Sequence, residues 1–317
     1  MSFSSEVKDE LSRHIPSKQH CRIAELAAII SMCGTVSISS DDCYGIRIVT
    51  ENLSVARKYF TLLKKTFNIS TELVVKYNMD NRKSRQYFIY VTDSEDSIRL
   101  LKATKLIDNH MEICENMSLV NNSIIERQCC KRAFIRGAFL ANGSISDPNK
   151  AYHFEIVCQS EEKAEQLKNI IDHFISEAKT VRRKNHYVTY IKEGSLIVDM
   201  LNIMEAHQSL MNLENVRIVK EVRNAINRKV NCEAANLNKT ISAAVKQIED
   251  IEYIRDSIGL DKLSENLRQI AVVRLENPEA TLTEISSLLP EPIGKSGVNH
   301  RLKKISEIAT ELKNRRI

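Results

Sequence analysis

The chain has 317 residues, of which 43% are hydrophobic and 27% are charged, and its formal net charge is +5. This composition is ordinary for a folded protein with sizeable apolar cores, so it excludes a chain that is disordered throughout. Because the polar start of the sequence is not followed by an apolar signal region, we expect a cytoplasmic protein.

Residues 1–20 come first, and we predict an amphipathic helix there with Phe3, Val7 and Leu11 on one side. Two later segments, CRIAELAAIISMCG at 21–34 and CKRAFIRGAFLANG at 130–143, are apolar almost all round and end at a glycine. Small residues recur in them at four-residue spacing: Ala24, Ala28, Ala133, Gly137 and Ala141. Both segments are shorter than the roughly 20 residues that a membrane span requires. We therefore predict two buried helices packed closely against each other.

Each of these two helices is followed by the same order of predicted elements, namely two strands, a helix, two strands and a helix. After Gly34 we expect them at 35–39, 44–50, 53–67, 72–77, 86–92 and 94–106, with turns at 41–42 and 78–84. After Gly143 we expect them at 144–146, 152–158, 161–175, 180–184, 187–191 and 195–204.

Short matches set the register between the two copies: Gly34-Thr35-Val36-Ser37 with Gly143-Ser144-Ile145-Ser146, Ile48-Val49 with Ile156-Val157, Ala56 with Ala164, and Tyr90 with Tyr190. A repeat of this length is too long for a solenoid unit, so it indicates a duplicated half-domain. We predict an αββαββα duplication with pseudo-twofold symmetry over residues 21–213, with half-repeats of about 21–110 and 130–213.

Two such halves that meet through a pair of glycine-terminated helices resemble the LAGLIDADG homing endonucleases. In that family an acidic residue just before each final glycine helps to hold the metal ions that drive DNA cleavage. The corresponding positions here are Cys33 and Asn142, whose thiol and neutral amide are poor ligands for Mg²⁺. Asp41, Asp42 and Asp147 lie nearby, but each is in a turn context in which Asp commonly bonds the local backbone. We expect no metal at these positions and no cleavage of DNA.

Basic residues also occur along the predicted strands, which homing endonucleases lay on DNA: Arg47, Lys76, Arg182, Arg183, Lys184 and Lys192. The acidic residues Glu72, Glu155 and Glu193 interrupt them. A solvated sheet face and a DNA-binding saddle are equal alternatives for these cations, and phosphate contact is the only role we assign them in the second case.

Eight cysteines are scattered through the chain. They include no CxxC pair and no partnered histidine spacing, which favours buried thiols over zinc ligands or a disulfide framework. We therefore expect no metal and no cofactor.

From Glu214 the apolar spacing becomes purely helical, which predicts a linker helix over 214–232. The polar run 231–238 predicts a break in this helix. An all-helical domain is expected to follow over 233–317, with its first helix at 239–254.

Within this domain a helix is expected at 263–275, where Asn277-Pro278 stops it. Thr281 and Glu284 form a capping-box pattern at the start of a short helix, and Ser296 is expected to cap a longer last helix. A short helix, a turn and a basic helix predict a helix-turn-helix motif at about 281–314.

From residue 293 to the end, seven basic residues stand against two glutamates, so this segment alone matches the net charge of the chain. Opposite the apolar stripe of the last helix lie Ser296, Asn299, His300, Lys303 and Lys304. Asn pairs with adenine and Lys with guanine edges, whereas Arg301, which flanks the stripe, suits phosphate. With Lys295 these are the expected DNA-binding residues. The alternatives are a basic solvated helix in a plain bundle and, for His300 alone, a surface histidine without a ligand role.

The string IGKSGVNHRLKKI at 293–305, after a degenerate duplicated LAGLIDADG-like domain, closely resembles the WhiA family of Gram-positive bacteria. The run Ala235-Asn236-Leu237-Asn238-Lys239 is also similar to that family, so the resemblance spans nearly the whole chain. It implies a DNA-binding regulator linked to cell division, chromosome segregation and, in spore formers, sporulation. The missing acids at Cys33 and Asn142 agree with the loss of nuclease activity that the resemblance implies.

The sequence thus predicts an α+β chain, in which a duplicated αββαββα LAGLIDADG-like domain precedes an all-α helix-turn-helix domain. The expected function is a non-enzymatic, sequence-specific DNA-binding protein of the nucleoid that binds double-stranded DNA. A protein partner could bind the LAGLIDADG-like domain, whereas no membrane and no small-molecule substrate is expected. Two alternatives stay open, an active homing endonuclease and a nucleoid or division-partner scaffold that binds DNA weakly.

Overall fold

The computed structural model describes residues 2–39, 43–77, 85–107 and 119–315. The chain folds into two compact units, residues 1–220 and residues 221–317, which are described separately. The turns predicted at 41–42 and 78–84 lie outside the described residues. No helix of the described residues is long and apolar enough to cross a membrane.

The first unit begins with a short helix and then contains the two predicted copies of one αββαββα order. The first copy consists of α2 (Gln19–Cys33), β1 (Gly34–Ile38), β2 (Tyr44–Thr50), α3 (Leu53–Phe67), β3 (Glu72–Tyr77), β4 (Arg85–Val91) and α4 (Ser94–Ala103). The second consists of α5 (Gln128–Asn142), β5 (Gly143–Ile145), β6 (Phe154–Cys158), α6 (Glu161–Asp172), β7 (Lys179–Arg183), β8 (His186–Ile191) and α7 (Gly194–Met204). A 3-10 turn (Asn122–Ile124) precedes α5. The predicted duplication is confirmed.

The strand register repeats as closely as the sequence matches require. The two four-stranded sheets have the orders β1-β2-β4-β3 and β5-β6-β8-β7. Gly34 pairs with Ile48 in the first sheet, and Gly143 pairs with Ile156 in the second. Alternate residues of β2 and β6 are buried, as expected for antiparallel sheets with one face on a core.

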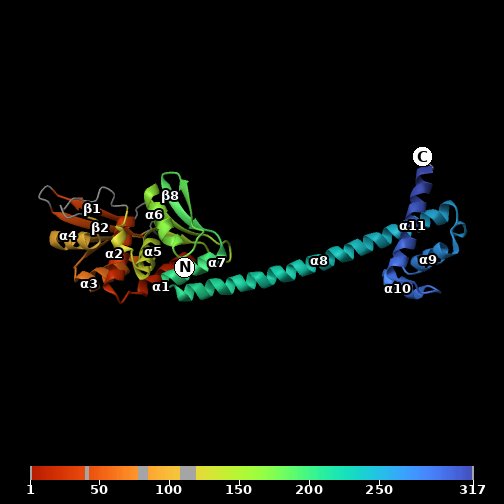
Figure 1. Ribbon diagram of the computed structural model, residues 1–317, viewed down its shortest axis with the longest axis horizontal. Helices are drawn as coiled ribbons and strands as arrows, with labels where there is room; N and C mark the ends of the chain where they lie inside the picture. Colours follow the sequence, from red (N-terminus) through yellow and green to blue (C-terminus); the bar gives the residue numbers. More distant parts are fainter. Residues whose placement is uncertain (1, 40–42, 78–84, 108–118, 316–317) are drawn as a thin grey trace. The chain divides into compact units, whose positions relative to one another are not determined.

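Helices α2 and α5 lie side by side at the centre of this unit, with one sheet beyond each of them (Figure 1). Their contact is close because small residues face each other across it. A Cβ atom added at Gly137 would lie 2.6 Å from the Glu25 carbonyl oxygen and 2.8 Å from the Ala28 Cβ. The close packing predicted from the small residues is therefore confirmed.

The N-terminal helix is shorter than the predicted span of 1–20. It is α1 (Phe3–Arg13), with Ser2 as its N-cap and with Val7 and Leu11 buried. Pro16 follows its end, and proline both lacks an N–H and disfavours a helical conformation at the residue before it. A separate helix, α2, then starts at Gln19.

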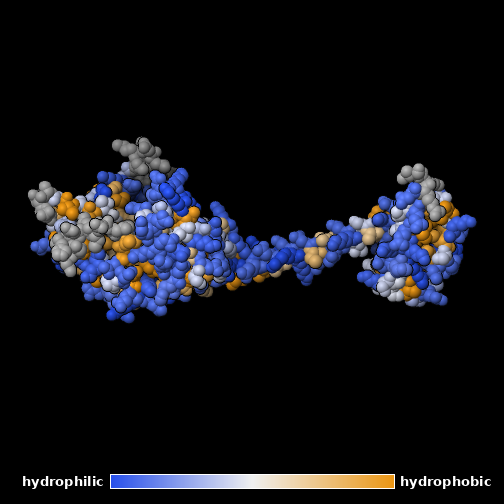
Figure 2. Space-filling model, turned by 45° about the horizontal axis from the view of Figure 1, so that its top comes forward, coloured by the Kyte–Doolittle hydropathy of each residue, from blue (hydrophilic) through white to orange (hydrophobic). Residues whose placement is uncertain are grey.

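The predicted break at 231–238 is wrong, because α8 (His207–Ser257) is one continuous helix. The run NCEAANLN contains neither Gly nor Pro, and its Ala, Glu and Leu residues are good helix formers. Polarity in that run therefore reflects a solvated helix and not a loop. The surface of α8 is mostly hydrophilic with some apolar side chains exposed (Figure 2), among them Val222, Ile226 and Val230.

The second unit is helical, as predicted. After α8 it contains a 3-10 turn (Leu260–Lys262), α9 (Glu265–Glu276), α10 (Leu282–Leu288) and α11 (Lys295–Arg315). Helix α9 ends just before Asn277-Pro278, and Thr281 and Glu284 form the predicted capping box of α10. Ser296 does not cap α11, because the Gly294 carbonyl already accepts from Gly297 and Val298, which places Ser296 inside the first turn.

We predict that Gly137→Ala destabilises the first unit by about 1–3 kcal/mol, because its Cβ would overlap the backbone of α2. Urea unfolding of the full chain measures this. Gly297→Ala in α11 is the control, since its Cβ would have no neighbour nearer than 3.4 Å, and we expect it to be neutral or stabilising by up to about 1 kcal/mol. Equal unfolding midpoints for Gly137→Ala and the unmodified chain would contradict the close approach.

Candidate functional site

Helices α10 and α11 form the predicted helix-turn-helix. Ile285 of α10 packs with Val298, Leu302 and Ile305 of α11, and all four side chains are buried. The Ser286 hydroxyl donates to the Ile293 carbonyl and so fixes the turn between the two helices. The apolar face of α11 is thereby committed to the core, which leaves the opposite face for another role.

That opposite face carries the residues predicted to bind DNA. The exposed ones are Lys295, Ser296, Asn299, His300, Lys303 and Lys304. Arg301 is half-buried beside the apolar stripe, which is the flanking position expected for a phosphate contact. The Lys303 Nζ atom lies 3.9 Å from Glu307 Oε1, and an exposed ion pair of this kind contributes little to stability. The sequence thus placed these residues on the correct face of α11, and their contact with DNA stays a prediction.

A cleft of about 340 Å³ opens beside the start of α11. Lys295 and Asn299 line it together with Lys239, Thr281 and Thr283. The last three were not among the predicted site residues. Lys239 belongs to the run Ala235–Lys239 that the family resemblance had already singled out, so that run was the signal available for it.

Arg274 also lines this cleft, although only 2% of its surface is exposed. Its Nη1 donates to the Ala280 carbonyl at 2.5 Å, while its Nε has no hydrogen-bond partner. Burial lowers the pKa of Arg274. Among the described residues no carboxylate pairs with it, so the cleft adjoins a cation that nothing nearby neutralises.

The glycine-terminated ends of α2 and α5 form a second candidate site, where homing endonucleases hold metal. The Asn142 side-chain amide donates to the Met32 carbonyl at 3.1 Å, and the Cys33 thiol donates to the Ile29 carbonyl at 3.2 Å. Asn142 therefore satisfies a carbonyl of the last turn of α2, and Cys33 bonds back to the carbonyl four residues earlier in its own helix. Burial raises the pKa of Cys33 to about 12, so its thiol is protonated and uncharged at neutral pH.

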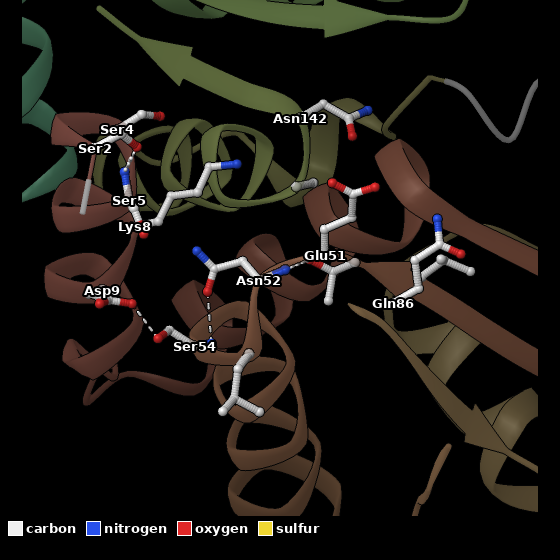
Figure 3. A pocket seen from close by; sticks show the side chains of 14 residues that line it. Ser2, Ser4, Ser5, Lys8, Asp9, Glu51, Asn52, Ser54, Gln86 and Asn142 are labelled. Carbon is white, nitrogen blue, oxygen red and sulfur yellow. Dashed lines mark hydrogen bonds between the residues drawn. The ribbon is translucent and has the colours of Figure 1, made fainter. Parts of the chain in front are cut away.

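Two lysines lie where a metal would be held. The Lys163 ammonium donates to the Ser31 carbonyl, and burial lowers the pKa of Lys163 to about 8. Burial also lowers the pKa of Lys8, which reaches with Glu51 and Asn142 into a cleft of about 760 Å³ (Figure 3). Glu51 brings one carboxylate to this cleft, and it interacts electrostatically with Lys8. The other groups, a protonated thiol, a donating amide and two amines, do not suit Mg²⁺, which takes charged oxygen ligands. The donor set does not fit a nuclease metal site.

The nearby aspartates do not replace the missing ligands within the described residues. The Asp147 carboxylate accepts from the Asn149 backbone N–H at 2.9 Å and from the Asn149 amide at 3.1 Å, the local bonding predicted for this turn. These bonds lower the pKa of Asp147. Asp41 and Asp42 lie outside the described residues.

The strand cations do not form one uniform basic surface. On the first sheet Lys76 lies over the Phe88 ring at 4.9 Å, and Arg47 pairs across from Tyr90. On the second sheet the Arg183 guanidinium lies 3.2 Å from the Glu155 carboxylate, which also contacts His153 at 2.9 Å. The charge of Arg183 is thus offset by Glu155, and a solvated sheet face and a DNA saddle both stay open for these cations.

Sequence patterns did not reveal a buried ion network between the two copies. The Glu25 carboxylate, which is fully buried, lies 2.8 Å from Lys58 Nζ and 3.2 Å from Arg136 Nε. Arg136 Nη1 reaches Glu205 at 2.5 Å, and Glu205 lies 3.1 Å from His14 Nε2. The residues of this network come from segments that are far apart in the sequence. A motif of closely spaced residues could therefore not have predicted it.

Three family models match this chain. They are described as the WhiA N-terminal LAGLIDADG-like domain, matching residues 19–107, the WhiA LAGLIDADG-like domain, matching 131–223, and the WhiA C-terminal HTH domain, matching 226–309.

Similar full-length proteins bear the name "Probable cell division protein WhiA". The one from Lachnoclostridium phytofermentans is 53% identical over 313 residues, covering 99% of this chain and 100% of its own. The one from Alkaliphilus oremlandii is 48% identical over 321 residues, covering 100% of this chain and 99% of its own. The crystal structure of full-length WhiA from Thermotoga maritima is similar with a TM-score of 0.59 and 26% identity, covering 98% of this chain and 99% of the other.

We predict that Glu25→Gln destabilises the first unit by about 3–5 kcal/mol, because it leaves Lys58 and Arg136 buried without their shared anion. Denaturant unfolding checks this. Glu205→Gln is the control and should cost less, since 33% of its side chain is exposed and water can replace the lost charge. If both variants unfolded at the same denaturant concentration as the unmodified chain, the network would not stabilise the first unit.

Lys163 should make stability depend on alkaline pH. The unfolded chain holds this proton up to about pH 10.5, whereas the folded chain releases it near pH 8. Between these two pH values the unfolded chain binds more protons than the folded chain. The contribution of Lys163 to the unfolding free energy therefore rises with pH, by up to about 1.4 kcal/mol per pH unit. We expect the unfolding free energy of the unmodified chain minus that of Lys163→Met to rise from pH 8 to pH 10.

Lys102→Met removes an exposed lysine from α4 and serves as the control for this measurement. It should leave the slope of unfolding free energy against pH as it is in the unmodified chain. Parallel curves for Lys163→Met and the unmodified chain would show that Lys163 keeps its proton on folding.

Proposed function

Since this chain belongs to the WhiA family, we propose that it is a non-enzymatic, sequence-specific DNA-binding protein that regulates transcription in cell division, chromosome segregation and sporulation. It binds double-stranded DNA through α11 and acts in the cytoplasm at the nucleoid. The observation that carries this proposal is the exposed face of α11, which presents Asn299 among cations on the second helix of a helix-turn-helix.

Chemistry around the start of α11 supports two kinds of DNA contact. Asn299 and Lys303 are exposed side chains one helical turn apart, which suits bonding to base edges in the major groove. Lys239, Lys295 and the buried Arg274 place positive charge around the adjoining cleft, which favours a phosphate there. Arg301, at the flank of the helix, supplies a further phosphate contact.

The enzyme alternative, an active homing endonuclease, lacks support from the metal positions. Cys33 and Asn142 are used to bond carbonyls of α2, and the amines of Lys8 and Lys163 disfavour a second cation nearby. Magnesium-dependent nicking of DNA that disappeared on changing Asn142 would favour the endonuclease over our proposal.

The scaffold alternative differs from a specific regulator in how strongly the chain prefers its own sites. Specific proteins bind their sites about 10³-fold or more tighter than random DNA. The test uses a DNA fragment selected from genome-wide binding footprints. If the chain bound this fragment no tighter than random DNA, the result would favour the scaffold. A protein partner captured by a pull-down through residues 1–213 would also favour the scaffold.

We predict different losses for two residues of α11. Asn299→Ala should relax base preference and weaken binding to the preferred site by about 1–3 kcal/mol, because a base-edge contact is lost. Arg301→Ala should weaken all sequences alike and reduce the slope of log affinity against log salt by about one, because a phosphate contact is lost. Fluorescence anisotropy with the selected fragment and with random DNA measures both.

Lys102→Ala, in α4 of the other unit, removes one exposed positive charge and serves as the matched control. It should leave affinity and salt slope unchanged. Equal loss on every sequence for Asn299→Ala would refute its role in base recognition, and so would the same salt slope change for both variants.

A further inference from the structure

Three cysteines and a histidine meet at the starts of the two central helices. His20 and Cys21 belong to the first turn of α2, and Cys129 and Cys130 belong to the first turn of α5. One ligand atom of each, an imidazole nitrogen or a thiol sulfur, lies within 4.8 Å of every other. No part of the proposed DNA-binding function uses this cluster, which lies at the end of the helix pair opposite Cys33 and Asn142.

The distances are close to those of a tetrahedral metal site. The His20 Nδ1 atom lies 3.1 Å from the Cys130 sulfur and 3.4 Å from the Cys21 sulfur. Zn²⁺ bonds sulfur at about 2.3 Å, which separates two sulfur ligands of one ion by about 3.8 Å. Small rotations of the four side chains would therefore place them around a single ion.

The surroundings also suit a bound ion. Cys21 and Cys130 are buried with Ala24 and Ala133, so the inner side of the cluster is apolar and small. A cleft of about 190 Å³, lined by Cys21 and Cys129 among others, adjoins the outer side and gives an ion a route in. A closed inner wall and an entry path are both required of a metal site.

Other roles for the cluster account for fewer of its members. A disulfide would join two of the three sulfurs and leave the third thiol and the imidazole without a purpose. Unrelated buried thiols would not need a histidine turned toward two of them. Three thiolates and one imidazole form a soft donor set that prefers zinc to the oxygen-seeking Mg²⁺ or Ca²⁺.

We propose that His20, Cys21, Cys129 and Cys130 bind one Zn²⁺ in a closed structural site. All four positions of a tetrahedral ion are filled by the protein, so the site holds structure and activates no water. The ion joins a helix of the first copy to a helix of the second. Binding displaces the three thiol protons to solvent, and the two positive charges of the metal offset two of the three thiolate charges.

Metal content of the full-length chain, expressed with added zinc and freed of loosely bound metal by gel filtration, tests the proposal directly. We expect about one equivalent of zinc per chain. Cys21→Ser and Cys130→Ser should lose it, whereas Cys232→Ser, which changes an exposed cysteine of α8, should keep it. The site would be overturned if Cys21→Ser and Cys130→Ser kept as much zinc as the unmodified chain. It would also be overturned if the unmodified chain held no zinc.

Two further measurements keep the test informative if a serine variant fails to fold. The unmodified chain, stripped by chelator and titrated with Co²⁺, should develop thiolate-to-cobalt charge-transfer absorption that saturates at about one equivalent. His20→Cys preserves four soft ligands and should still bind, whereas His20→Ala should bind at least about tenfold more weakly. No charge-transfer band in the unmodified chain, or equal affinities for the two His20 variants, would refute the assignment.

Discussion

The fully buried Glu25 carboxylate is the constraint on which the first unit depends. Lys58 and Arg136 are buried cations that both pair with this anion, and Arg136 pairs with Glu205 as well. Lys58 also donates to the Leu11 carbonyl at 3.0 Å, and Arg136 to the Met204 carbonyl at 3.3 Å. One carboxylate thus connects helices α1, α2, α3 and α5 with the end of α7. Because Glu25 comes from the first copy and Arg136 from the second, separating the two copies would break this ion pair.

Gly137 allows this network to form. Its missing side chain lets α5 approach the Glu25 backbone, and Arg136, one residue earlier, then reaches the Glu25 carboxylate. The two ends of this helix pair carry different kinds of side chain. Lysines and hydrogen-bonding groups fill one end, and the other gathers three sulfurs and an imidazole. The seam between α2 and α5 therefore holds the two halves of the unit together.

Periodicity predicted the fold well, because strands, helices and caps are local. The match of Ile48-Val49 to Ile156-Val157 even set the correct strand register. What it missed is non-local. Glu25 and Arg136 come from different copies, and the thiols of Cys21 and Cys130 are separated by more than a hundred residues, so spacing rules had nothing to detect. Two local predictions, a helix cap at Ser296 and a helix break at 231–238, were wrong for another reason. Polar residues of these types occur in caps, in loops and on exposed helix faces alike.

The lysines at the glycine-terminated ends of α2 and α5 would oppose metal binding there even if an acidic residue were introduced. Lys8 and Lys163 both interact electrostatically with Cys33, so a carboxylate introduced at that position would first pair with an ammonium. It would then be neutralised before any divalent ion arrived. Asn142 would in addition have to give up the bond that satisfies the Met32 carbonyl. A nuclease metal site at this place would therefore need more than one change, because the thiol, the two lysines and the Asn142 hydrogen bond all stand in its way.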